Sequence, residues 1–155
     1  MNEKFMREAI ALSLQNVRSG RGGPFGAVVV QGEQVIGRGA NRVTLAHDPT
    51  AHAEVVAIRA ACQALGSFEL RDCEMYCSCE PCPMCLGAIY WARLRRYYYA
   101  NTREDAARAG FDDSRIYDEI SMPVDVRSVP GSRLPLPEAI VAIDDWIRSG
   151  TKEPY

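Results

Sequence analysis

The alternation of apolar and polar positions predicts an amino-terminal helix followed by a two-stranded hairpin. The dipeptide Ser19-Gly20 and the run Gly22-Gly23-Pro24 are expected to end the helix. The segments FGAVVV, from residue 25, and QVIGRGA, from residue 34, then have the pattern of strands joined across QGE. The apolar residues that fall largely on one face of the helix are Phe5, Met6, Ala9, Ile10, Leu12 and Val17.

The middle of the chain predicts a second helix and then a strand, helix and strand in succession. The segment Asp48-Pro49-Thr50 offers an N-cap candidate before strong helix formers in residues 51–65. CEMYCS, from residue 73, and RRYYYA, from residue 95, are short and rich in strand-forming residues. The helix between them begins on proline. Two strands linked by one helix indicate a parallel crossover.

The last third of the chain is less regular. We expect a mixed region over residues 104–120, a strand from Val124 to Val129 and a helix from Pro137 to Arg148. The whole pattern predicts an α/β fold, a three-layer α/β/α sandwich on a mixed central sheet of about five strands. No repeat or linker divides the sequence, so we expect a single domain over residues 1–155.

Composition narrows the class of protein. A chain of 155 residues that is 47% hydrophobic and 25% charged can bury a core without disulfides. The start of the chain lacks the basic and apolar regions of a signal peptide, and no apolar run reaches the roughly 18 residues of a membrane span. We therefore expect a cytoplasmic protein without a membrane partner. A net charge of -2 gives no basic footprint for nucleic acid, so we expect no such partner either.

The stretch CSCEPCPMC, residues 77–85, contains four of the six cysteines. In a reducing compartment such clusters more often bind metal or take part in chemistry than form disulfides. An iron–sulfur motif would need a further cysteine where Ile89 stands, and a thioredoxin-like pair would not follow a hairpin. Cys82 and Cys85 open a helix three positions apart, which suits zinc, because the helix N-terminus lowers the pKa of both thiols.

A third zinc ligand must come from elsewhere, and the chain has two histidines. His52 begins the sequence His52-Ala53-Glu54, and PCPMC follows at residues 81–85. This pair of motifs, H-x-E and P-C-x-x-C, is typical of zinc nucleobase deaminases. We therefore predict one Zn²⁺ per chain, held by His52, Cys82 and Cys85, with the fourth position open as in catalytic sites. His47 is expected to be structural or exposed.

Glu54 is not needed as a ligand. A carboxylate beside the metal can take a proton from water and deliver protons to the ring nitrogen and the leaving amine. Alternatively, Glu54 is an ordinary acidic residue in the first turn of a helix; the motif spacing favours the catalytic role. The remaining cysteines are expected to be packing residues, namely Cys62, Cys73, Cys77 and Cys79.

Over nearly its whole length, the chain resembles the bacterial guanine deaminases of the cytidine deaminase superfamily. The zinc motifs are shared by the superfamily, whereas FDDS, from residue 111, and the terminal tyrosine point to guanine. The segments that carry the resemblance are GGPFGAVVV, NRVTLAHDPTAHAEVVAIR, SCEPCPMCLGAIYWAR, AGFDDSRIYDEI and KEPY.

The resemblance implies hydrolysis of guanine, a purine base, to xanthine and ammonia. It also implies a catalytic Asp113 beside the amino group, and a homodimer whose exchanged C-terminal segments each cover the partner's site with Tyr155. The residues that it implies for the base pocket are Phe25 and Asn41, and Ala53 is a further substrate-binding candidate. Trp91 and Phe111 are either additional walls of the pocket or ordinary packing residues.

Other functions stay open at this point. The segments DPTAHAE and EPCPMC also resemble tRNA adenosine deaminases, which must hold a polyanion with clustered basic residues. Here only Arg93, Arg95 and Arg96 cluster, at the end of a helix where the dipole explains them. Guanosine or another aminopurine is a further candidate substrate. A non-catalytic zinc module is the alternative from another class, although it would have no use for Glu54 and usually fills all four ligand positions.

Overall fold

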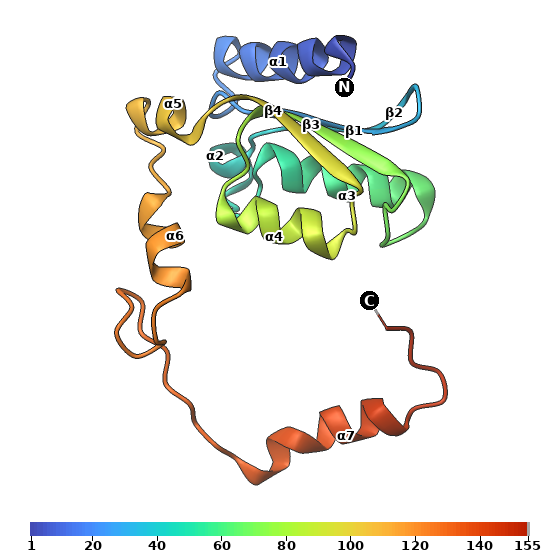
Figure 1. Cartoon of the computed structure of the whole chain (residues 1–155), viewed down its shortest axis with the longest axis vertical. Helices are drawn as coiled ribbons and strands as arrows, with labels where there is room; N and C mark the ends of the chain where they lie inside the picture. Colours follow the sequence, from blue (N-terminus) through green and yellow to red (C-terminus); the bar gives the residue numbers. More distant parts are fainter. Residues whose placement is uncertain (155) are drawn as a thin grey trace. The chain divides into compact units, whose positions relative to one another are not determined.

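A mixed sheet lies at the centre of the first of two units into which the chain divides, Met1–Asp113 and the segment from Ser114. The computed structural model describes residues 1–154. The strands of the sheet are β1 (Gly26–Gln31), β2 (Gln34–Ala40), β3 (Cys73–Cys79) and β4 (Arg96–Asn101), in the order β2-β1-β3-β4. β1 is antiparallel to β2 and β3, whereas β3 and β4 are parallel (Figure 1).

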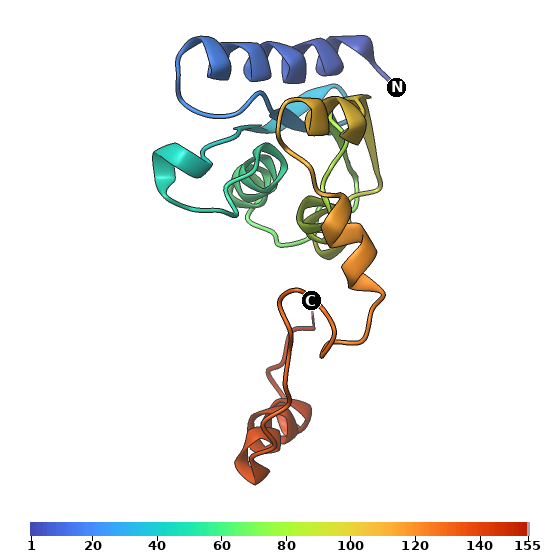
Figure 2. The ribbon, with the colours of Figure 1, turned by 90° about the vertical axis from the view of Figure 1, so that its left-hand side faces the viewer.

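Helices cover both faces of this sheet. α1 (Glu3–Arg18) lies on one face, and α3 (Ala53–Leu65) and α4 (Pro83–Trp91) lie on the other (Figure 2). Because side chains alternate along a strand, β1 contributes residues to two cores. Val28 and Val30 pack with α1, and Ala27 and Val29 pack with α3. The predicted three-layer sandwich on a mixed sheet is confirmed.

Glycines allow the helices to approach the strands closely. A Cβ atom at Gly39 of β2 would overlap the carbonyl oxygen of Ala53, in the first turn of α3. Gly26 at the start of β1 stands in the same relation to the carbonyl oxygen of Ala9 in α1. These contacts fix the beginning of α3 against the end of β2.

The predicted helix boundaries are largely confirmed, and two details are wrong. Ile10 and Val17 of α1 are 43% and 48% exposed, because the face that meets the sheet centres on Phe5, Ala9 and Asn16. The segment Asp48-Pro49-Thr50 does not supply the N-cap of α3; within it, the Asp48 carboxylate accepts hydrogen bonds from the Thr50 backbone and hydroxyl. The N-cap is His52, and a short unpredicted helix, α2 (Val43–Ala46), precedes it.

The β3-α4-β4 crossover has the predicted parallel geometry. α4 starts on proline as expected, and Cys82 is its N-cap. After β4, the first unit continues with α5 (Arg103–Arg108), where Thr102 and Asp105 form a capping box. The crossover therefore places the start of α4 at the carboxyl end of β3.

The second unit contains α6 (Ser114–Ile120), a 3-10 helix η1 (Pro137–Ile140) and α7 (Val141–Arg148). The predicted strand from Val124 to Val129 is wrong: the segment forms turns and bends, in which the Arg127 guanidinium donates to the carbonyls of Ile120 and Met122. Strand-forming residues without a partner strand have no ladder to join. Within residues 1–154 the sheet thus has four strands, one fewer than expected.

None of the helices in residues 1–154 has the length and apolar run that crossing a membrane requires. No residue of the second unit up to Pro154 is buried, so this segment has no core of its own. The expectation of one domain over residues 1–155 stays a prediction.

Gly39→Ala should lower the free energy of unfolding by about 2–3 kcal/mol, because its methyl group overlaps the α3 backbone. Urea unfolding of the metal-loaded protein measures this change. Gly87→Ala in α4 is the control: a Cβ there meets no atom within 4 Å, and alanine favours a helix by up to about 1 kcal/mol. Equal unfolding midpoints for the two variants would contradict the close packing of β2 and α3.

Candidate active site

Two helix N-termini converge on the candidate site. His52 and Cys82 are the N-caps of α3 and α4, both in extended backbone conformations. Neither side chain makes the usual capping hydrogen bond to its own helix, so both are available for other contacts. The partial positive charge of a helix N-terminus favours thiolates at this point.

The three predicted ligands lie together. His52 Nδ1 is 3.5 Å from Cys82 Sγ and 3.5 Å from Cys85 Sγ. With zinc–nitrogen and zinc–sulfur bonds of ordinary length at a tetrahedral angle, the nitrogen and sulfur atoms would be roughly 3.6 Å apart. The possible ligand atoms of this group all lie within 4.8 Å of one another. One nitrogen and two sulfurs at these separations fit a zinc ion.

The charges of this cluster are tightly linked. A hydrogen bond with Cys85, together with the smaller effect of His52, lowers the pKa of Cys82 to about 4. The same hydrogen bond raises the pKa of Cys85, while a hydrogen bond with Cys82 raises the pKa of His52. Cys82 is therefore the thiolate of the pair, and metal binding would require Cys85 to lose its proton as well.

Glu54 lies beside the cluster, in the first turn of α3, and is only 6% exposed. Its Oε2 accepts a hydrogen bond from Cys85 Sγ at 3.4 Å. Burial raises the pKa of Glu54, because a charged carboxylate loses its hydration there. A carboxyl group with a raised pKa next to a metal site can both accept and donate a proton.

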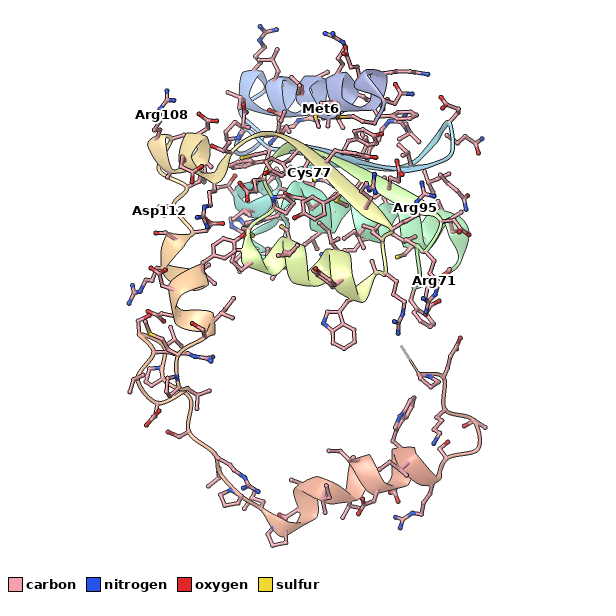
Figure 3. The ribbon with its side chains drawn as sticks, viewed as in Figure 1. Met6, Arg71, Cys77, Arg95, Arg108 and Asp112 are labelled. Atoms are coloured by element: carbon pink, nitrogen blue, oxygen red, sulfur yellow. The ribbon has the colours of Figure 1, made fainter. Side chains whose placement is uncertain are left out.

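The cysteines outside the metal cluster make other contacts. The Cys79 thiol donates to the carbonyl oxygen of Thr102 at 3.4 Å, and burial raises its pKa to about 11. Cys77 is buried in the core on the α3 side of the sheet, and its label in Figure 3 falls in the interior of the first unit. Cys73 is in the same core, with Cys62 packed against it. These cysteines have the packing role that the sequence suggests.

Several residues expected in the base pocket also belong to the first unit. Asn41, at the end of β2, is 6% exposed, and its Oδ1 accepts from the backbone N–H groups of Gly23 and Val43 at 3.4 and 3.3 Å. The rings of Phe25 and Phe111 meet edge to face, with centroids 4.9 Å apart. The Phe25 contact thus links Phe111, in the segment after α5, to the start of β1.

The pKa of Asp113 depends on burial and on one of the candidate metal ligands, Cys82. Burial raises the pKa of Asp113, and the negative charge of Cys82 raises it further. Ala53, the first residue of α3, is buried between the metal ligand His52 and Glu54. The expected roles of Asp113 and Ala53 toward the base stay predictions.

Trp91 is placed differently. It is the last residue of α4, about nine positions or roughly 13 Å along the helix axis from Cys82, and it is 67% exposed. The structure therefore does not bring Trp91 together with the metal cluster. Tyr155, the expected lid residue, lies outside the described residues.

Sequence reasoning missed the polar residues that hold the loop before β1. Ser13 and Asn16 of α1 donate to the carbonyl oxygens of Pro24 and Gly23, and Ser78 Oγ accepts from the Gly26 N–H group. The run Gly22-Gly23-Pro24 was the available signal, since such a loop needs partners for its backbone groups.

Comparison with known proteins defines the class to which this fold and site belong. Residues 1–101 match the family model for the cytidine and deoxycytidylate deaminase zinc-binding region. The chain is a member of this family of zinc-binding deaminases, which confirms the resemblance and agrees with the expected zinc cofactor.

Among its relatives, a guanine deaminase from Bacillus subtilis (strain 168) is 50% identical over 154 residues, or 99% of each chain. An X-ray structure of guanine deaminase from Bacillus subtilis matches with a TM-score of 0.97 and 51% identity, over 100% of this chain and 99% of that chain. A guanine deaminase structure from Nitrosomonas europaea has a TM-score of 0.69 and 32% identity, over 73% of this chain and 65% of that chain. A tRNA-specific adenosine deaminase from Agrobacterium fabrum is 50% identical over 76 residues, 49% of this chain and 50% of its own length.

The purified protein should contain about one zinc ion per chain, since one nitrogen and two sulfurs form its site. Cys82→Ser and Cys85→Ser should each lose most of this zinc, as measured by elemental analysis. Cys79→Ser is the matched control and should keep it, because its side chain hydrogen-bonds to Thr102. Loss of zinc from the Cys79 variant alone would overturn the ligand assignment.

Proposed function

We propose that the protein is a guanine deaminase that hydrolyses guanine to xanthine and ammonia. The observation that carries this proposal is the buried Glu54 beside His52, Cys82 and Cys85, in a chain related to a guanine deaminase over almost its entire length. The deaminase chemistry is supported by the metal cluster, and the choice of guanine is supported by the extent of that relationship.

The chain's own groups have distinct roles in this reaction. Zinc held by His52, Cys82 and Cys85 would supply a water molecule of lowered pKa as the nucleophile. Glu54 takes up the two protons of that water one after the other on a carboxylate oxygen, and passes the first to the ring nitrogen next to the attacked carbon and the second to the departing amine. Its burial supports this role, because a raised pKa allows the carboxyl group to hold a proton between these transfers.

The base is positioned by side chains around the metal cluster. Among the described residues, the side-chain hydrogen bonds of Asn41 use Oδ1, which leaves the Nδ2 amide group to donate to an acceptor on the purine. Phe25 and Phe111 provide an aromatic wall. Asp113 accepts a hydrogen bond from the amino group that is removed, in keeping with its electrostatic coupling to Cys82.

The alternative of a tRNA adenosine deaminase has less support. The relationship to the Agrobacterium enzyme covers only 49% of this chain. Of the three clustered arginines, Arg93 forms an ion pair with Glu69 and Arg95 forms one with Glu74, which, in the part of the chain that the structure describes, leaves Arg96 alone in that cluster for a phosphate. Figure 3 shows Arg71, Arg95 and Arg108 at the periphery of the first unit, with Arg108 far from the other two. A polyanion would require such cations to cluster.

A non-catalytic zinc module also accounts poorly for the site. Such sites usually have four protein ligands, whereas the cluster found within residues 1–154 contains three. Burying Glu54 costs free energy, because a carboxyl group loses hydration, and a purely structural zinc site would not need it there.

We also infer a homodimer with exchanged C-terminal segments. None of residues 114–154 is buried, and α7 exposes Ile143, Trp146 and Ile147. An apolar surface of this kind is typical of a segment that packs against another chain. Exchange between identical chains adds little cost, since both chains use the same contacts.

The six free cysteines are in keeping with a cytoplasmic location.

Ammonia release from guanine, guanosine, adenine, cytosine and cytidine tests the proposed substrate. Guanine should have the highest kcat/KM of the panel. In Glu54→Gln, guanine turnover should fall by roughly 10²- to 10⁴-fold while zinc content stays the same, because the variant loses only the proton carrier. A preference for another base would exclude the guanine assignment, and near-normal turnover in Glu54→Gln would remove this residue from the mechanism.

Deletion of residues 151–155 tests the exchanged segment. The deletion should leave zinc content and folding intact but greatly reduce guanine turnover, because the site loses the cover that excludes water. Mixing the deleted chain with Glu54→Gln should restore part of the activity, since one site of the mixed dimer regains both the glutamate and the tail. Unchanged kinetics after deletion, or inactive heterodimers, would contradict the exchange.

A further inference from the structure

Asn16 is a buried polar side chain of α1 that connects two separate segments of the first unit. It is 6% exposed. Its amide nitrogen Nδ2 donates to the carbonyl oxygens of Gly23 and Asn41, each at 2.9 Å. Both N–H bonds of one amide group are therefore used to join the loop before β1 to the end of β2.

The two carbonyl groups flank the residues proposed to bind the base. Gly23 lies two positions before Phe25, and the other carbonyl belongs to Asn41 itself. The two segments also meet directly, since the Asn41 N–H group donates to the Phe25 carbonyl oxygen at 3.1 Å. A Cβ atom at Gly22 would overlap the Asn41 carbonyl oxygen, so only glycine allows this approach.

A cavity beside these segments makes the connection important. It has a volume of about 350 Å³, and its lining includes Asn16, Ala40 and Arg42. Backbone that borders a cavity is not held in place by close packing from that side. The cavity is lined by Ala40 and Arg42, the two neighbours of Asn41, and the Asn16 amide holds the carbonyl group between them from the side of α1.

Other hydrogen bonds hold the loop without reaching Asn41. The Ser13 hydroxyl donates to the Pro24 carbonyl oxygen at 3.0 Å, and Ser78 Oγ accepts from the Gly26 N–H group at 2.9 Å. Loss of either bond would loosen the loop alone, whereas loss of the Asn16 amide would loosen both the loop and Asn41.

We propose that Asn16 is a positioning residue that sets the orientation of the Asn41 side chain toward the purine and thereby controls the affinity for the base. This inference rests on the proposed function, in which Asn41 donates to the substrate. A hydrogen bond made to bound substrate throughout the reaction contributes mainly to KM. Asn16 therefore acts on binding through Asn41 and does not touch the base.

Asn16→Ala should lower kcat/KM for guanine by roughly 10- to 100-fold, because small displacements of a binding group have large effects. Most of this loss should appear as a higher KM, with zinc content unchanged. Gln15→Ala is the matched control: the neighbouring exposed residue lines the same cavity but makes neither hydrogen bond, and its kinetics should stay those of the parent protein. A loss confined to kcat, or an equal loss in both variants, would overturn the inference.

A double-mutant cycle separates positioning from general stabilisation. In an Asn41→Ala background, adding Asn16→Ala should lower kcat/KM by a clearly smaller factor than in the parent protein, since no Asn41 amide remains to be positioned and only the loop before β1 is loosened. A merely structural role would give the same fold-loss in both backgrounds and would overturn the inference. If Asn16→Ala does not fold, the cycle is run with Asn16→Ser, whose hydroxyl can donate one of the two hydrogen bonds and should give an intermediate loss.

The proposed function and this inference can fail separately. A parent protein without guanine turnover would refute the function itself. A parent protein that deaminates guanine, together with fold-losses that multiply in the cycle, would refute only the role of Asn16.

Discussion

The convergence of two helix N-termini on one point is the constraint on which the rest of the structure depends. His52 and Cys82 can face one another only if α3 and α4 start side by side at the same end of the sheet. The β3-α4-β4 crossover sets the start of α4, and the close contact between Gly39 and Ala53 sets the start of α3. The metal cluster is thus a product of sheet topology and backbone packing.

Around the metal cluster the fold shields charged groups from water. Glu54 is buried beside two sulfur atoms and an imidazole, and its raised pKa follows from that burial. Asn41 and Phe25 belong to segments that are tied together at the end of the sheet by Asn16 of α1. The proposed reactive groups therefore belong to α3 and α4, whereas Asn41 and the loop before β1 are also held by α1 from the opposite layer, with Phe25 packed against the core on the α3 side.

The sequence was sufficient to predict the layers and to group the ligand candidates, because both depend on short-range patterns. Cys82 and Cys85 are three positions apart at the start of a predicted helix, and His52 and Glu54 stand at the start of another. Asn16 could not be found in this way, since its role depends on contact with a residue 25 positions away. The strand expected over residues 124–129 failed for a related reason: propensity is local, whereas a strand needs a partner.

The lack of buried residues in the segment from Ser114 to Pro154 has a consequence for the protein in dilute solution. A segment without a core gains little from remaining ordered by itself, and ordering its backbone costs conformational entropy. If a second copy supplies the missing contacts, the order of this segment depends on protein concentration by mass action. Susceptibility to proteases after Asp113 would then rise on dilution, while the sandwich of the first unit stayed protected.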